Sequence, residues 1–158
     1  MYVDSTNNKF EGELLDTYRS HEEQIGRMLG LLDGTKRFSY SLWYVPDDAG
    51  WPDGDGYDES KYGWEYIQAG GSADAMTVEV KRLETDGEYH QYVLGRPGDD
   101  TGEPDVRIPI AENGEDVRPS EVFTADTATP IFYHYFRTNT VPDGLTLREL
   151  DLSWGESG

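Results

Sequence analysis

The chain has 158 residues and carries 13 basic against 32 acidic side chains, which gives a net charge of −19. Such a surface repels phosphate backbones and anionic lipid, so nucleic-acid and membrane binding are disfavoured and a cationic protein partner is favoured. The absence of cysteine excludes disulfides, thiolate zinc sites and cysteine nucleophiles. The acidity has a second explanation, because negative charge also keeps a protein in solution.

The length predicts a single domain over residues 1–158, with a loose polar segment at 1–9 and a tail at 153–158. No apolar run approaches the roughly 20 residues that span a bilayer, and segment 1–9 lacks the apolar core of a secretion signal. We therefore expect a cytoplasmic protein. Aromatic residues make up 13% of the chain, which is typical of a folded protein and not of a disordered one.

The first half of the chain reads as one helix, two strands and a loop. Apolar residues from Phe10 to Leu32 recur at steps of three and four, which predicts a helix with a gap in its apolar stripe near Ser20. The alternating segments 37–45 and 62–69 predict strands. Between them, segment 46–61 is rich in Asp, Gly and Pro and is predicted to be a loop.

A hairpin and a short strand follow. Segments 75–83 and 88–95 alternate apolar and polar residues around an Asp86-Gly87 turn, which predicts an antiparallel hairpin. Segment 106–110 predicts a short strand, and the charged segment 111–116 predicts a turn.

The segment 117–152 is expected to contain a helix and a final strand. Ser120 is the expected N-cap, and Pro130 is expected to kink or divide the helix because it has no backbone N–H. The Val141-Pro142-Asp143-Gly144 turn then leads into an apolar-alternating tail with Leu145, Leu147 and Leu150. The predicted fold is an α+β domain. It consists of a mainly antiparallel sheet with an N-terminal and a C-terminal helix packed on one face, and a short final strand.

The acidic loop is the main candidate for a functional site. Trp51 lies among its carboxylates, and an aromatic anchor with a charged rim is typical of a protein-binding surface. The predicted partner-binding residues are Asp47, Asp48, Trp51, Asp53, Asp55, Asp58 and Glu59. An ordinary solvated turn remains an alternative. Calcium binding remains another, although the loop lacks the DxDxDG core with a glutamate at its twelfth position.

No catalytic motif is present. The histidines His21, His90 and His134 form no HExxH or HxH pair, and GxSxG, GxGxxG and P-loop patterns are absent. We therefore expect no enzyme activity, no cofactor and no metal site. A small enzyme that brings His90 or His134 next to carboxylates remains an alternative. Carbohydrate or small-ligand binding is another, carried by the tryptophans Trp43, Trp51, Trp64 and Trp154, although core packing is their default role in strands.

The C-terminal segment HYFRTNTVPDGLTLREL resembles the Imm1-type immunity proteins of bacterial polymorphic toxin systems. Members of that family resemble one another in a late helix ending in an aromatic residue, a turn with Thr or Gly, a proline, and a short segment carrying a tryptophan. The matching positions are Phe136, Thr138, Pro142, Leu145 and Thr146, and Leu147 stands where the tryptophan is usual. The Gly70-Gly71 pair after an aromatic strand also matches, as does the chain length.

The resemblance implies a small α+β protein of the bacterial cytoplasm that binds a cognate toxin domain, of the nuclease or deaminase class, and blocks its active site. The charge is consistent with this function, because enzymes that act on nucleic acid are basic and an acidic protein can fill their groove. Such an inhibitor needs preorganised acidic groups around a few aromatic anchors, and no turnover.

Overall fold

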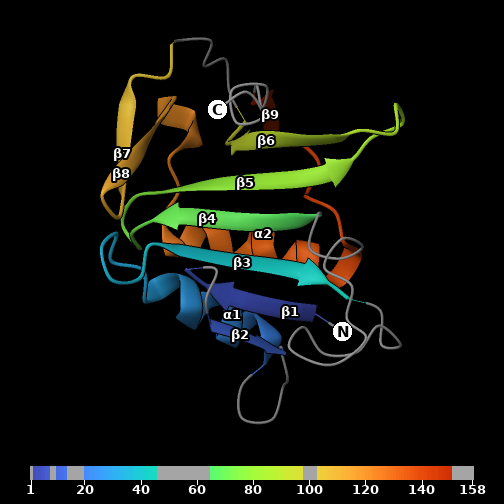
Figure 1. Cartoon of the computed structure of the whole chain (residues 1–158), viewed down its shortest axis with the longest axis horizontal. Helices are drawn as coiled ribbons and strands as arrows, with labels where there is room; N and C mark the ends of the chain where they lie inside the picture. Colours follow the sequence, from blue (N-terminus) through green and yellow to red (C-terminus); the bar gives the residue numbers. More distant parts are fainter. Residues whose placement is uncertain (1, 8–9, 14–19, 46–64, 98–102, 151–158) are drawn as a thin grey trace.

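The computed structural model describes residues 2–7, 10–13, 20–45, 65–97 and 103–150 (Figure 1). The strands of the main sheet are β1 (Tyr2–Thr6), β2 (Phe10–Glu13), β3 (Ser39–Tyr44), β4 (Tyr66–Gly71), β5 (Met76–Leu83), β6 (Tyr89–Gly95) and β9 (Thr146–Glu149). The other elements are α1 (His21–Gly30), β7 (Val106–Ile110), β8 (Asn113–Val117), the 3-10 helix η2 (Pro119–Glu121) and α2 (Ala125–Thr138). The seven strands lie in the order β2-β1-β3-β4-β5-β6-β9, and all neighbouring pairs are antiparallel. The predicted α+β class is confirmed.

Both helices pack on one face of this sheet, as predicted, and α2 runs behind β3 and β4 in Figure 1. Apolar side chains at alternate positions of β3, β4 and β5 point to this face, since successive strand residues point to opposite sides. The buried core residues are Ile25, Leu29, Leu32, Tyr40, Leu42, Ile67, Ala69, Met76, Val78, Val80, Leu94, Phe123, Ala128, Ile131, Phe132 and Tyr135.

The N-terminal predictions need correction. Segment 1–9, predicted to be loose, contributes β1, which pairs with both β2 and β3. The predicted helix from Phe10 to Leu32 is divided, because residues 10–13 form β2 and the helix begins only at His21. Residues 10–13 form a strand because they pair with β1, and the local spacing of their apolar residues could not show this pairing. The Ser20 hydroxyl accepts the Glu23 N–H at 3.2 Å, so the gap in the apolar stripe marks the start of α1.

Helix α2 begins later than predicted. Ser120 belongs to η2, and the N-cap of α2 is Thr124, whose hydroxyl accepts the Thr127 N–H at 3.3 Å. Pro130 lies inside α2 without dividing it. Its position on the exposed side lets water reach the Asp126 carbonyl that the missing N–H leaves unpaired.

Several strand predictions are confirmed, and one turn prediction is wrong. The β5–β6 hairpin forms as predicted, with Gly87 at φ 82° in its turn. The predicted turn at 111–116 is mostly strand β8, and only its first residues make the turn, with Ala111 at φ 55°. The predicted final strand forms as β9, in which Leu147 is 39% exposed and Arg148 pairs with buried Glu121.

The β7–β8 hairpin forms a separate two-stranded sheet that packs on the face opposite the helices, at one end of the main sheet (Figure 1). Beneath and beside it, one row of mainly polar residues crosses the main sheet from strand to strand. In register this row is Ser5, Ser41, Gln68, Glu79, Val93 and Arg148. One face of the sheet therefore carries the main apolar core, and the other carries this polar row between two smaller apolar clusters.

Candidate functional site

The predicted docking loop falls within segment 46–64, which lies outside the described residues. This applies to all seven predicted partner-binding residues, Asp47, Asp48, Trp51, Asp53, Asp55, Asp58 and Glu59. They remain predictions, and the candidate surface is built here from the described part of the chain.

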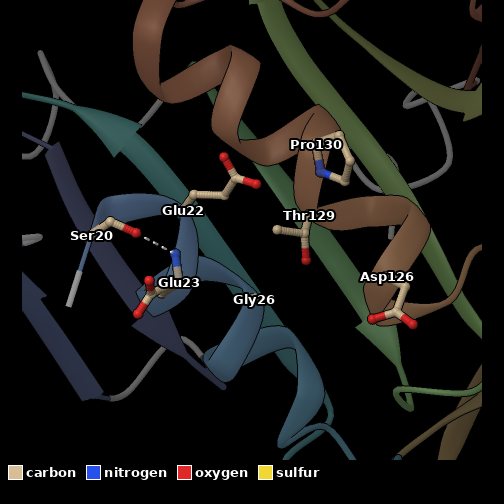
Figure 2. A pocket seen from close by; sticks show the side chains of 7 residues that line it. All are labelled: Ser20, Glu22, Glu23, Gly26, Asp126, Thr129 and Pro130. Atoms are coloured by element: carbon tan, nitrogen blue, oxygen red, sulfur yellow. Dashed lines mark hydrogen bonds between the residues drawn. The ribbon is translucent and has the colours of Figure 1, made fainter.

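An open groove of about 520 Å³ lies between α1 and α2 (Figure 2). Its described lining residues are Ser20, Glu22, Glu23, Gly26, Asp126, Thr129 and Pro130. The helices pack closely at Gly26, where a Cβ would lie 3.4 Å from the side chain of Thr129, at van der Waals contact.

The rim of this groove is acidic. Glu22 and Glu23 lie in the first turn of α1, and Asp126 lies in the first turn of α2. All three residues are exposed, and none of the described lining residues is basic. The first turn of a helix also favours carboxylates for reasons of stability, because its free N–H groups carry partial positive charge. Chemically, the groove suits a cationic side chain.

A second polar cluster lies at the free end of the β5–β6 hairpin. His90 Nδ1 is 2.7 Å from Glu149 Oε1, and His90 Nε2 is 2.7 Å from Asp86 Oδ2. The hydrogen bond to Asp86, followed by that to Glu149, raises the pKa of His90. In its protonated form His90 can donate a hydrogen bond to both carboxylates, one from each ring nitrogen.

The other two histidines form no site with His90. His134 lies on α2 and is not among the partners of His90, and the His21 ring packs 4.4 Å from the Phe136 ring. Within the described ranges, no group of three or more His, Asp or Glu residues could hold a metal ion.

A third cluster is buried beneath the β7–β8 hairpin. Glu79 is 9% exposed, and its Oε2 accepts the Gln91 Nε2–H at 2.8 Å. Burial raises the pKa of Glu79 well above its usual range, and a hydrogen bond with Glu115 raises it further. Burial, and then the charge of Glu79, raises the pKa of Tyr66 to about 12. The Tyr66 hydroxyl donates to Gln91 Oε1 at 3.3 Å. These groups are therefore linked through Gln91.

Beside it lies a buried ion pair. Glu121 is 1% exposed and accepts from Arg148 Nε at 2.9 Å and from Arg148 Nη2 at 3.0 Å. Its Oε1 also accepts the Arg118 N–H at 2.7 Å. The hydrogen bond to Glu121 raises the pKa of Arg148. This bidentate pair fixes β9 to η2.

Sequence reasoning missed this buried cluster. Glu79 stands between Val78 and Val80 in an alternating strand, and such a position is ordinarily solvent-facing. It is buried because the β7–β8 hairpin covers it. The sequence feature that could have indicated a covered face is the Gly70-Gly71 pair, because two glycines allow another segment to approach the sheet closely.

The described residues offer little to a sugar or other small ligand. Trp43 is 9% exposed and packs with Val3 and Val45. The other three tryptophans, Trp51, Trp64 and Trp154, lie outside the described residues. A further open groove of about 430 Å³ is lined by Thr35, Ala111, Glu112 and Asn113, and it gathers no catalytic set.

None of the helices in the described part of the chain is long and apolar enough to span a lipid bilayer. A comparison of the chain with known protein families and with curated proteins finds no match.

Proposed function

We propose that this chain is an immunity protein that binds a basic toxin domain, of the nuclease or deaminase class, and blocks its active site without turnover. The observation that carries the proposal is the α1–α2 groove, whose described lining holds three carboxylates and no basic side chain. The net charge of −19 supports it, because a strong negative field attracts a cationic partner from a distance. The resemblance of the C-terminal segment to Imm1-type immunity proteins is a further support.

The groove suits a cationic partner because its three carboxylates project from helices that are already packed together. Glu22, Glu23 and Asp126 therefore need no backbone rearrangement when a guanidinium or ammonium group of the toxin enters. Trp51 and the carboxylates around it would add an aromatic anchor with a charged rim. In this arrangement the anchors set the affinity, and the charge sets the rate of association.

The test is co-purification with the protein encoded by the neighbouring gene, followed by titration calorimetry at several salt concentrations. The groove variant combines Glu22→Gln, Glu23→Gln and Asp126→Asn. The matched control removes three exposed carboxylates elsewhere and combines Glu88→Gln, Glu112→Gln and Asp143→Asn. We expect the groove variant to bind more weakly and with less salt dependence than the control. Equal affinity and equal salt dependence of the two variants would remove the groove from the interface.

The predicted loop is tested separately with Asp53→Asn, Asp55→Asn and Asp58→Asn in one chain. We expect weaker binding than in the same matched control. If this variant binds as the wild type does while the groove variant is impaired, the contact surface lies on the helices and not on the loop. If no partner is captured by the wild type, the inhibitor function itself fails.

One observation favours the alternative of a small enzyme or ligand-binding domain. The pKa of Glu79 is raised by burial and by Glu115, and perturbed carboxyl pairs are common in active sites. Neither open groove is lined by these two residues. The Glu79→Gln variant separates the functions, because an inhibitor retains its affinity for the partner when this carboxyl is lost.

A further inference from the structure

The β7–β8 hairpin fits closely against the face of the main sheet opposite the helices. A Cβ at Gly70 would lie 2.9 Å from Ile110 Cδ1, and one at Gly71 would lie 2.8 Å from Ile108 Cγ2. Ile108 is buried in one cluster with Val93 of β6. The hairpin is therefore held by a narrow apolar contact, with little room to adjust.

Two carboxyl groups meet in this contact. Glu79 belongs to β5, and Glu115 lies in β8 directly opposite Ile108. The Glu115 carboxyl lies within hydrogen-bonding reach of Glu79. Glu79 Oε2 accepts from Gln91, whereas buried Glu79 Oε1 has no hydrogen-bond partner among the described residues. When both carboxyls are ionised, Glu79 and Glu115 repel each other. A proton on either carboxyl converts this repulsion into a hydrogen bond.

The groups that surround the pair do not replace this proton. The charge of Arg148 of β9 lowers the pKa of Glu79, but Arg148 is bound to Glu121 of η2 through two nitrogens. The charged groups that act on Glu79 are Glu115 of β8 and Arg148 of β9, and the charge of Glu79 acts on Tyr66 of β4. Lys81 of β5 shares the face of Glu79, since the two are alternate residues of one strand. Arg107 of β7 pairs with Asp116 instead. Among the described residues, no ion pair joins Glu79 or Glu115 to a basic side chain.

We propose that one proton shared between Glu79 and Glu115 latches the β7–β8 hairpin to the main sheet, and that the hairpin opens when this proton is lost to solvent. The step breaks one carboxyl O–H bond and transfers the proton to water or hydroxide, with no redox change. Opening separates the two negative charges and exposes the apolar side of the hairpin around Ile108. This device does not depend on the identity of the partner.

The direction of the pH dependence follows from the pair. Burial, and then the hydrogen bond and charge of Glu115, raises the pKa of Glu79 in the closed state. The proton therefore stabilises the closed hairpin fully below the ordinary pKa of a glutamate. This stabilisation is lost as the pH rises through the raised pKa of Glu79. Above that value the opening constant increases by up to about tenfold per pH unit.

Hydrogen exchange on the full chain measures this opening. Protection factors, corrected for the intrinsic pH dependence of exchange, are followed in β7–β8 and, as an internal reference, in the β3–β4 ladder. We expect the β7–β8 protection to fall by up to about tenfold per pH unit above the raised pKa, while the reference stays flat. Parallel behaviour of the two regions across the pH range would overturn the proposal.

Two variants test whether the pH dependence of β7–β8 protection comes from the Glu79–Glu115 pair. Glu115→Gln introduces an amide that donates to the Glu79 carboxylate without titrating. The loss of β7–β8 protection should therefore begin at a lower pH than in the wild type, and the burial of Glu79 should leave a residual pH dependence. Glu112→Gln removes an exposed carboxyl from the turn of the same hairpin and should keep the wild-type slope. If protection in Glu115→Gln begins to fall at the same pH as in the wild type, the latch is refuted.

A measurement on the wild type keeps the test independent of variant folding. Carbon-13 chemical shifts of the glutamate carboxyls are followed against pH. We expect one carboxyl of the pair to titrate well above the ordinary value of 4.5. Ordinary midpoints for both carboxyls would overturn the proposal.

Discussion

Loss of Arg148 should destabilise the fold far more than loss of an exposed arginine. In Arg148→Met, Glu121 keeps only the Arg118 N–H at 2.7 Å while remaining 1% exposed. Breaking a buried pair by removing one partner costs about 3–5 kcal/mol, because the remaining charge has no compensation. The matched control is Arg107→Met, since Arg107 is 61% exposed in its pair with Asp116. A surface pair of this kind contributes at most about 1 kcal/mol.

Replacing Glu121 should cost less stability than replacing its partner Arg148. Glu121→Gln keeps an oxygen that accepts the Arg118 N–H, and the side chain of Arg148 is 22% exposed, so water can solvate it. We expect this variant to lose only about 1–3 kcal/mol. Urea denaturation, with the midpoint and slope fitted together, gives the free energy of unfolding. A loss in Arg148→Met below about 1 kcal/mol, or below that of Glu121→Gln, would refute this reasoning.

Three further predictions concern the core, a turn and a titration. Phe132→Ala should cost about 3–5 kcal/mol in urea denaturation because Phe132 is fully buried, and half-buried Phe136→Ala should cost less. Gly71→Ala should destabilise more than Gly87→Ala. Both glycines have positive φ, but only at Gly71 would a Cβ meet another atom, at 2.5 Å. Equal losses would contradict this. His90 should titrate above its ordinary 6.5 in NMR, and its stabilising contribution is lost as the pH rises through that raised pKa. A midpoint at or below 6.5 would contradict the two carboxylate contacts.

The fold class could be predicted from the sequence because the strongest local patterns match the helices and strands of the tertiary structure. The β5–β6 hairpin alternates strictly around an Asp-Gly turn, and the apolar positions Ile131 and Tyr135 of α2 face the sheet as their spacing predicts. The errors fall where pairing with a distant segment decides the outcome. Residues 10–13 have helical spacing, yet antiparallel pairing with β1 makes them a strand.

The candidate site was less accessible from sequence. Glu22 and Glu23 could have been placed in a first helical turn, because Ser20 is a good N-cap. Nothing in the local pattern showed that Asp126 of α2 would line the same groove, since that depends on how the two helices pack. The burial of Glu79 likewise depends on a hairpin that is remote in sequence.

The inhibitor function is tested most directly by the affinity for the neighbouring gene's protein as a function of salt, in the wild type and in the groove variant Glu22→Gln/Glu23→Gln/Asp126→Asn. For the wild type we expect tight binding that weakens steeply as salt screens the opposite charges. For the groove variant we expect weaker binding with a shallower salt dependence. Absence of wild-type binding, or binding that salt does not change, would contradict an acidic inhibitor of a basic toxin.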